Sequence, residues 1–202
     1  MQKNYQTFIN CVVWVSIILF LVVHFVIRPY DGGSTWDKET LAGDIGYCVT
    51  GVSILAWLFN HCLWKIPFIG KRFHTPNLNG VWKGSGKGHS DKNSEPFNMT
   101  LKISQTFLET HINAYFDKSQ SDSFSSVFIH NETTGRICLV YSYQNDPKLE
   151  FRSKAEKGED GGLSIHYGTT RLDVDFEDLH HLAGTYLNDR ECVGTIDLTK
   201  EQ

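Results

Sequence analysis

The chain has 202 residues, of which 41% are hydrophobic, and its formal net charge at pH 7 is −4. The acidic excess lies in the C-terminal part, because residues 75–202 carry 13 Lys and Arg against 19 Asp and Glu. Binding of long nucleic acid requires a broad basic surface, so this charge excludes that class of partner.

Two apolar segments precede residue 75, and each is long enough to cross a bilayer as a helix. The first, at about 8–27, contains no Asp, Glu, Lys or Arg and has the length that spans the hydrocarbon core. The second, at about 45–64, also lacks formal charge. No small-x-small cleavage site follows the first segment before Arg28, which argues against a signal peptide. We therefore predict a two-helix transmembrane region over residues 1–74.

The flanking charges predict how this region is oriented. Residues 28–44 carry two basic and four acidic side chains, whereas Lys65, Lys71 and Arg72 follow the second helix without an acid. The positive-inside rule then places both termini and the C-terminal domain in the cytoplasm. In that reducing compartment the five cysteines should be free thiols, with no disulfide or zinc site.

Small residues line one face of the second helix, because Gly43, Gly46, Thr50 and Ser53 recur at spacings of three and four. Such faces let helix backbones approach closely in lipid. The face is expected to pack either against the first helix of the same hairpin or against another protomer. A two-helix hairpin cannot enclose a pore, so a membrane-active role requires a homo-oligomer.

From residue 75 onward, apolar and polar residues alternate with a period of two. Met99, Leu101 and Ile103 share one face of a strand, and similar runs recur about every 10 residues between turn sequences. Roughly eight strands joined by hairpins predict an all-β domain over residues 75–202, an eight-stranded antiparallel up-and-down, lipocalin-like barrel. A two-sheet sandwich is the alternative. A barrel of this size is wide enough to hold one small ligand.

The β domain carries no motif that supports catalysis or metal binding. Its histidines are scattered, and the adjacent His180 and His181 would face opposite sides of a strand. The glycine-rich stretch 84–88 lacks the spacing of a phosphate-binding loop. We therefore expect neither an enzyme nor a metal site.

Aromatic and arginine side chains are the candidates for binding a ligand, because rings stack on bases and guanidinium groups bind phosphates. The candidate ligand-binding residues are Tyr141, Tyr143, Tyr167, Tyr186, Arg136 and Arg152. Arg190 offers the same guanidinium group, but a structural role is favoured for it. In that role Arg190 packs over Trp82 of the first strand as a cation–π plug of one barrel end, as in lipocalins.

Together these features resemble a known family. The motifs are Leu78-x-Gly80-x-Trp82-x-Gly84 and, near the C-terminus, Leu182-x-Gly184-x-Tyr186-x-x-Asp189-Arg190-x-x-x-Gly194-x-Ile196. Placed after two N-terminal helices, they resemble the β-strand-rich membrane effectors of bacterial CBASS anti-phage defence. The resemblance implies a barrel that binds a cyclic dinucleotide made by a partner CD-NTase, and it implies no cofactor. It also implies oligomerisation on binding and disruption of the inner membrane by the helices, which kills the cell.

Two other functions are compatible with the same elements. A membrane-tethered, lipocalin-like carrier or sensor of an apolar ligand predicts an apolar barrel interior without buried Arg. A plain interaction module predicts that a partner docks on the barrel's outer surface.

Overall fold

The computed structural model of the chain describes residues 2–27, 38–89 and 96–201. The chain divides into two compact units, Met1–Ile66 and Pro67–Gln202. This division falls somewhat before residue 75, where the sequence pattern changes. Each unit is described below by itself.

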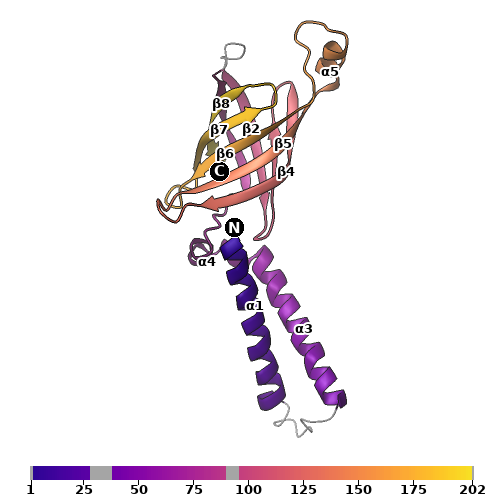
Figure 1. The fold of residues 1–202 in the computed structure, drawn as a ribbon, viewed down its shortest axis with the longest axis vertical. Coiled ribbons are helices and arrows are strands. Elements are labelled where there is room, and N and C mark those ends of the chain that lie inside the picture. The colour runs from indigo at the N-terminus through magenta and orange to yellow at the C-terminus, as the bar shows by residue number, and fades with distance from the viewer. Residues whose placement is uncertain (1, 28–37, 90–95, 202) are drawn as a thin grey trace. The chain divides into compact units, whose positions relative to one another are not determined.

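The first unit is a helical hairpin. Its first helix, α1 (Gln2–Val22), continues as the π-helical turn η1 (Val23–Ile27), and α3 (Lys38–His61) runs antiparallel beside it (Figure 1). The short 3-10 helix η2 (Leu63–Lys65) follows. Two candidate membrane spans, Gln6–Ile27 and Leu41–Lys65, have mean hydropathies of 2.6 and 1.5. The structure thus contains two helices that are long and apolar enough to cross a membrane, as predicted.

Contacts between the described parts of the two helices occur along their length. The rings of Phe8 and Phe59 lie 5.2 Å apart, and a Cβ at Gly51 would lie 3.0 Å from the Leu19 side chain. Near the other end, His24 Nδ1 lies 2.9 Å from Asp44 Oδ2. The expected start of the second helix at residue 45 is therefore corrected: the helix begins at Lys38, because Asp44 is buried against His24 rather than solvated in a loop.

The second unit is a closed antiparallel barrel. After the short helix α4 (Pro67–Arg72) each strand pairs with the next along the chain, and β1 pairs with β8 to close the barrel (Figure 1). The strands are β1 (Gly80–Gly88), β2 (Pro96–Gln105), β3 (Thr110–Tyr115), β4 (Ser119–His130), β5 (Ile137–Pro147), β6 (His166–Val174), β7 (His181–Asn188) and β8 (Val193–Lys200). The predicted up-and-down barrel is confirmed, and the sandwich alternative is wrong.

One helix interrupts this pattern, since α5 (Leu149–Glu156) lies on the connection between β5 and β6 (Figure 1). None of its residues is buried, so its sequence shows no apolar stripe from which the helix could have been predicted.

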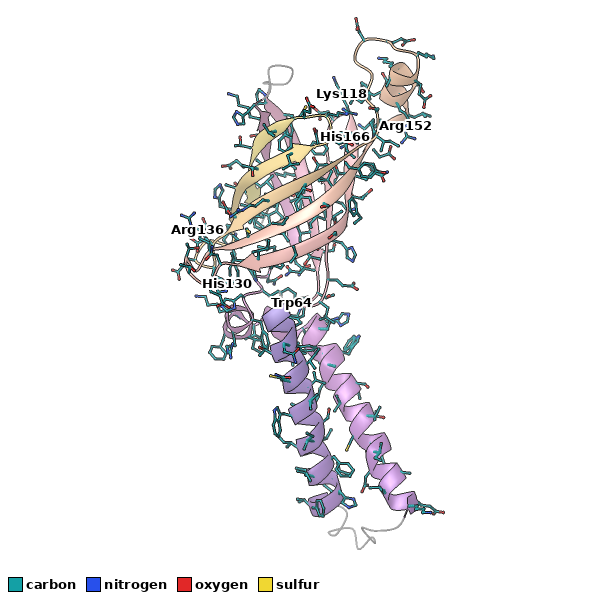
Figure 2. The ribbon with its side chains drawn as sticks, in the orientation of Figure 1. Trp64, Lys118, His130, Arg136, Arg152 and His166 are labelled. Carbon is teal, nitrogen blue, oxygen red and sulfur yellow. The ribbon has the colours of Figure 1, made fainter. Side chains whose placement is uncertain are left out.

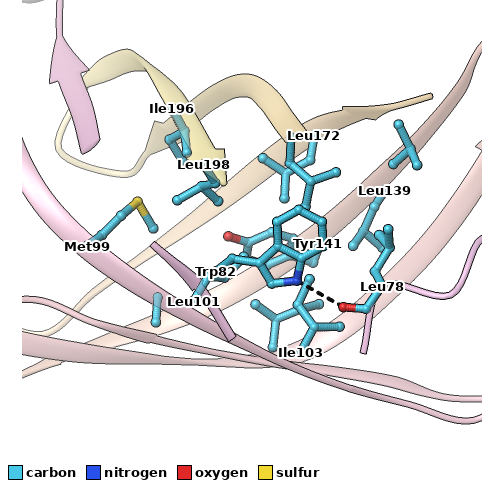
Figure 3. Packing of buried hydrophobic residues seen from close by; sticks show 14 of the residues in the cluster. Leu78, Trp82, Met99, Leu101, Ile103, Leu139, Tyr141, Leu172, Ile196 and Leu198 are labelled. Carbon is cyan, nitrogen blue, oxygen red and sulfur yellow. Dashed lines mark hydrogen bonds between the residues drawn. The ribbon is translucent and has the colours of Figure 1, made fainter. Parts of the chain in front are cut away.

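The apolar core fills the end of the barrel at which the chain enters β1. Trp82 is fully buried there among Leu and Ile side chains from several strands, and its Nε1 donates a hydrogen bond to the Leu78 carbonyl at 2.9 Å (Figure 3). Gln105 holds the entering segment in place: its Oε1 accepts from the Leu78 N–H, and its Nε2 donates to the Pro76 carbonyl. This end of the barrel is closed.

The cation over Trp82 differs from the expected one. Lys200 Nζ lies 5.4 Å from the centroid of the Trp82 ring, whereas Arg190 lies at the opposite end of the barrel. The reason is the antiparallel pairing of β1 with β8, which places the end of β8 beside the start of β1, with Trp82 opposite Lys200. The expected Trp82–Arg190 plug is therefore replaced by Trp82–Lys200.

Candidate ligand-binding site

The barrel encloses a cavity of about 370 Å³ at the end opposite the Trp82 core. Its walls come from the first residues of β2, β4, β6 and β8, the last residues of β3, β5 and β7, and the turns between them. This volume lies within the usual range of small-molecule sites. The barrel therefore has one end packed with apolar side chains and one end hollowed.

Aromatic rings line much of the cavity. They belong to Phe97, Phe116, Tyr141, Tyr143 and Tyr186. The ring of Phe97 lies 5.8 Å from that of Phe116 and 6.0 Å from that of Tyr186, and the Tyr141 and Tyr143 rings lie 6.1 Å apart. These flat apolar faces can stack on planar heterocycles.

Glycines on neighbouring strands make room for three of these rings. A Cβ at Gly86 would lie 2.3 Å from the Phe97 ring. A Cβ at Gly168 would lie 2.4 Å from Tyr143, and one at Gly194 would lie 2.5 Å from Tyr186. Each ring thus lies directly against a strand backbone, and the glycines help to set the width of the cavity.

Buried polar groups lie on the same walls. The side chain of Asn145 donates to the hydroxyls of Ser121 and Ser119, at 2.9 and 3.1 Å, and Asn145 itself is 5% exposed. Burial raises the pKa of Tyr141 to about 12, and a hydrogen bond with Thr170 acts in the opposite direction. Burial also raises the pKa of Tyr143 and Tyr186. These tyrosines are therefore neutral hydrogen-bonding groups at pH 7.

Two cationic side chains and a histidine lie at the edge of the cavity. Lys118, His166 and Arg190 all line it, and Lys118 and His166 lie at the same end of the barrel in Figure 2. Arg190 Nη2 donates to the Ser164 hydroxyl at 3.0 Å and also to the Ser164 carbonyl, which fixes the guanidinium group. Burial first, and then the Arg190 charge, lower the pKa of His166 below its ordinary value. Asp117 is the acidic residue on this wall.

The candidate ligand residues expected from the sequence fall into two groups. Tyr141, Tyr143 and Tyr186 line the cavity together. Tyr167 is 51% exposed on the outer surface, where its ring lies 6.4 Å from that of Phe124.

Neither of the two expected arginines lines the cavity. Arg136 precedes β5 at the other end of the barrel, and Arg152 lies on α5, where its guanidinium group pairs with Asp146 (Figure 2). Ligand contact by Arg136 and Arg152 stays a prediction that the cavity does not support.

Several cavity residues were missed as ligand candidates. Lys118 and His166 lie next to turns, where the strand pattern gives no signal, and Asn145 resembles a turn residue beside Asp146 and Pro147. Arg190 was considered for phosphates but assigned to the plug. Strand parity was an available signal for Tyr167: Leu172 and Thr170 point inward, so Tyr167 must point outward.

No metal centre is found in the described part of the chain, where no three His, Cys, Asp or Glu side chains gather closely enough to hold an ion. The described cysteines, Cys11, Cys48, Cys62, Cys138 and Cys192, are free thiols.

The small-residue face of α3 is not the face that contacts α1. Gly46, Thr50 and Ser53 are exposed in the hairpin, and a Cβ at Gly46 would meet no atom within 4 Å. Gly51, which lies against Leu19, belongs to the contacting face instead.

A closed eight-stranded barrel with an aromatic cavity edged by cations defines a small-molecule-binding barrel suited to a planar, anionic ligand. The comparisons with known proteins give the particular family. The family model described as "Cap15, cyclic dinucleotide receptor domain" matches residues 73–200, and the chain therefore belongs to this family. Its barrel is a cyclic dinucleotide receptor domain, which confirms the resemblance to the CBASS effectors.

Two curated relatives carry the name "CD-NTase-associated protein 15". The protein from Yersinia aleksiciae is 31% identical over 151 residues, which cover 74% of this chain and 66% of that relative. The protein from Staphylococcus schleiferi is 25% identical over 187 residues, covering 93% of this chain and 92% of that relative.

Proposed function

We propose that the chain is a CBASS effector that binds a cyclic dinucleotide in the barrel cavity and converts this binding into damage of the inner membrane. The observation that carries the proposal is the pairing of aromatic walls with a cationic edge in the one hollowed end of a receptor-domain barrel. The role is that of a receptor, without catalysis.

The cavity chemistry matches the two parts of such a ligand. The rings of Tyr143, Tyr186 and Phe97 offer faces on which bases stack, each stack worth about 1–3 kcal/mol. Arg190 and Lys118 supply positive charge for the phosphates at the edge. A local cluster of this kind offsets the net acidity of the domain, because charges beyond about 10 Å are screened by salt.

The polar groups within the cavity favour this ligand over an apolar one. Asn145 and Ser121 are almost fully buried and hydrogen-bonded to each other on the cavity wall. A fatty acyl chain would offer no hydrogen bond to the remaining donors and acceptors of these groups, which disfavours it there. They can instead meet the polar edge of a base.

For ligand binding to cause membrane damage, it must be linked to the association of protomers. Ligand can shift that equilibrium only through its preference for the associated form. A coupling of about 1–3 kcal/mol tightens association roughly 5- to 150-fold per protomer. The exposed face of Gly46, Thr50 and Ser53 supports contact between protomers, since α1 does not occupy it within the hairpin. The flanking charges support a multi-pass hairpin with the barrel in the cytoplasm.

A thermal-shift experiment tests ligand binding. The full-length chain in detergent is heated with cyclic di-AMP, cyclic di-GMP, cyclic GMP–AMP or cyclic di-UMP, with the linear dinucleotides as matched controls, and with palmitate. We expect one cyclic dinucleotide to raise the Tm and the linear forms to have little effect. A Tm increase with palmitate alone would overturn the proposal in favour of a lipid carrier.

A further inference from the structure

A buried acid–base pair lies inside the membrane hairpin. His24 Nδ1 and Asp44 Oδ2 are 2.9 Å apart, and the two side chains are 2% and 0% exposed. Both lie within the candidate spans Gln6–Ile27 and Leu41–Lys65. Each lies three residues from the end of its span, and ionisable side chains within membrane spans are candidates for functional sites.

The backbone and neighbouring rings hold His24 in a defined position. His24 lies in the π-helical turn η1, a local departure from α-helix that recurs at functional sites. Its ring stacks on Phe20, with centroids 5.4 Å apart and planes at 8°, and meets the edge of Phe25 at 4.8 Å. Cys48, one turn after Asp44, is buried as well.

The helices of the hairpin also meet at contacts other than this pair. The Phe8–Phe59 contact and the close approach of Gly51 to Leu19 already join α1 and α3. A buried ion pair usually adds no stability over apolar residues of similar volume, because desolvation offsets the attraction. Stability alone therefore does not account for His24 and Asp44.

Charged and histidine side chains are few in the two spans. In the sequence of residues 6–27 and 41–65, Asp44 is the only acidic side chain, Lys65 at the end of the second span is the only Lys or Arg, and His24 and His61 are the only histidines. A membrane path for ions needs polar or charged side chains facing it. His24 and Asp44 are thus the one place in the described hairpin where an acidic and a basic side chain of the two spans lie together.

We propose that His24 and Asp44 form the polar lining of the membrane lesion: paired inside the resting hairpin, they face water once protomers assemble. The inference rests on the proposed function, since it assigns the residues through which that function acts. Small ions and water are the species that pass along this lining.

The test uses full-length protein in vesicles of phosphatidylethanolamine and phosphatidylglycerol that contain a fluorescent dye. The cyclic dinucleotide that raises the Tm most is the trigger. The decisive variant, His24→Leu with Asp44→Leu, removes both polar groups while leaving no unpaired charge. The variant His24→Asn with Asp44→Asn removes both ionisable groups but keeps polar side chains. The control, Ser16→Leu with Val49→Leu, changes one residue of each helix outside the pair.

We expect the leucine variant to insert, bind and cross-link into oligomers like the wild type, yet to leak dye about tenfold more slowly. The asparagine variant and the control should leak within about threefold of the wild type. Wild-type leakage in the leucine variant would overturn the inference and leave the proposed function intact. An equal loss of leakage in the asparagine variant would also overturn the inference, because it would show that the pair is required for packing. Absence of leakage in the wild type would instead reject the proposed function and the inference with it.

Discussion

Arg190 is the residue on which the ligand-binding account depends most. Its guanidinium group lines the cavity and is fixed by the backbone and hydroxyl oxygens of Ser164, so it is preorganised for an anion. A hydrogen bond to a charged group contributes about 1.5–3 kcal/mol.

We therefore expect Arg190→Ala to weaken cyclic dinucleotide binding by about 10- to 100-fold without changing the far-ultraviolet circular dichroism. Isothermal titration of the detergent-solubilised chain measures the change. Arg152→Ala is the matched control, because Arg152 pairs with Asp146 on α5 and does not line the cavity. A loss of binding confined to Arg152→Ala would place the phosphate site on α5 and contradict the cavity.

His166 predicts a pH dependence of binding. Its pKa is lowered in the free protein, by burial and by Arg190, so the imidazole is neutral at pH 7. A bound phosphate favours the protonated form and raises this pKa, so binding takes up a proton.

Affinity should therefore increase as the pH falls from about 7.5 towards 5.5, by up to about tenfold for each unit by which the ligand raises the pKa of His166. Titrations in buffers of different ionisation enthalpy measure the proton uptake. The pH dependence should disappear in His166→Gln; if it persists there, another group takes up the proton.

The tyrosines show what strand periodicity can and cannot predict. Tyr141 and Tyr143 share the face of Leu139, and Tyr186 shares the face of Leu182, so alternation alone places these three inside the barrel. The cations were harder to assign because they belong to turns, where no period applies. The cations line one cavity because β1 pairs with β8 and closes the barrel. The sequences of these two strands do not reveal that pairing.

Among the elements, the strands were predicted well and the helices less so. Alternating runs such as Met99–Ile103, with a spacing of about 10 residues per strand, predicted roughly eight strands, because inward-facing residues are also core or cavity residues. The second helix was placed too late because Asp44 was read as a loop residue, whereas its partner His24 keeps it buried. The glycine motifs have a structural basis: a Cβ at Gly84 or Gly184 would lie 1.9 Å from the carbonyl oxygen of the neighbouring strand.

The exposed face of α3 that carries Gly46, Thr50 and Ser53 predicts that mutation can separate ligand binding from membrane damage. Gly46→Leu with Thr50→Leu places large side chains on a face that is exposed in the hairpin, so the fold and ligand binding should be unchanged. Protomer contact should be blocked, because the backbones can no longer approach closely. Cross-linking in vesicles and dye release measure these effects.

The control for this pair is Val49→Leu with Ile45→Leu, on exposed positions of the same helix that are already apolar. Dye release by Gly46→Leu with Thr50→Leu at the wild-type rate would reject the small-residue face as the association surface.

The whole molecule combines two units, a receptor-domain barrel and a helical hairpin. The barrel closes one end with Trp82 and Lys200 and leaves the other for a ligand, while the hairpin carries two candidate spans and one buried acid–base pair. Neither unit alone accounts for the membrane damage that we propose to depend on a nucleotide. The central claim is therefore the coupling between them.

Dye release from vesicles that hold the full-length chain tests this coupling most directly. The account predicts slow release without nucleotide and an increase of at least about tenfold on addition of the cyclic dinucleotide that raises the Tm, with Arg190→Ala shifting the response to higher concentration. Release at the same rate with and without the bound nucleotide would contradict it.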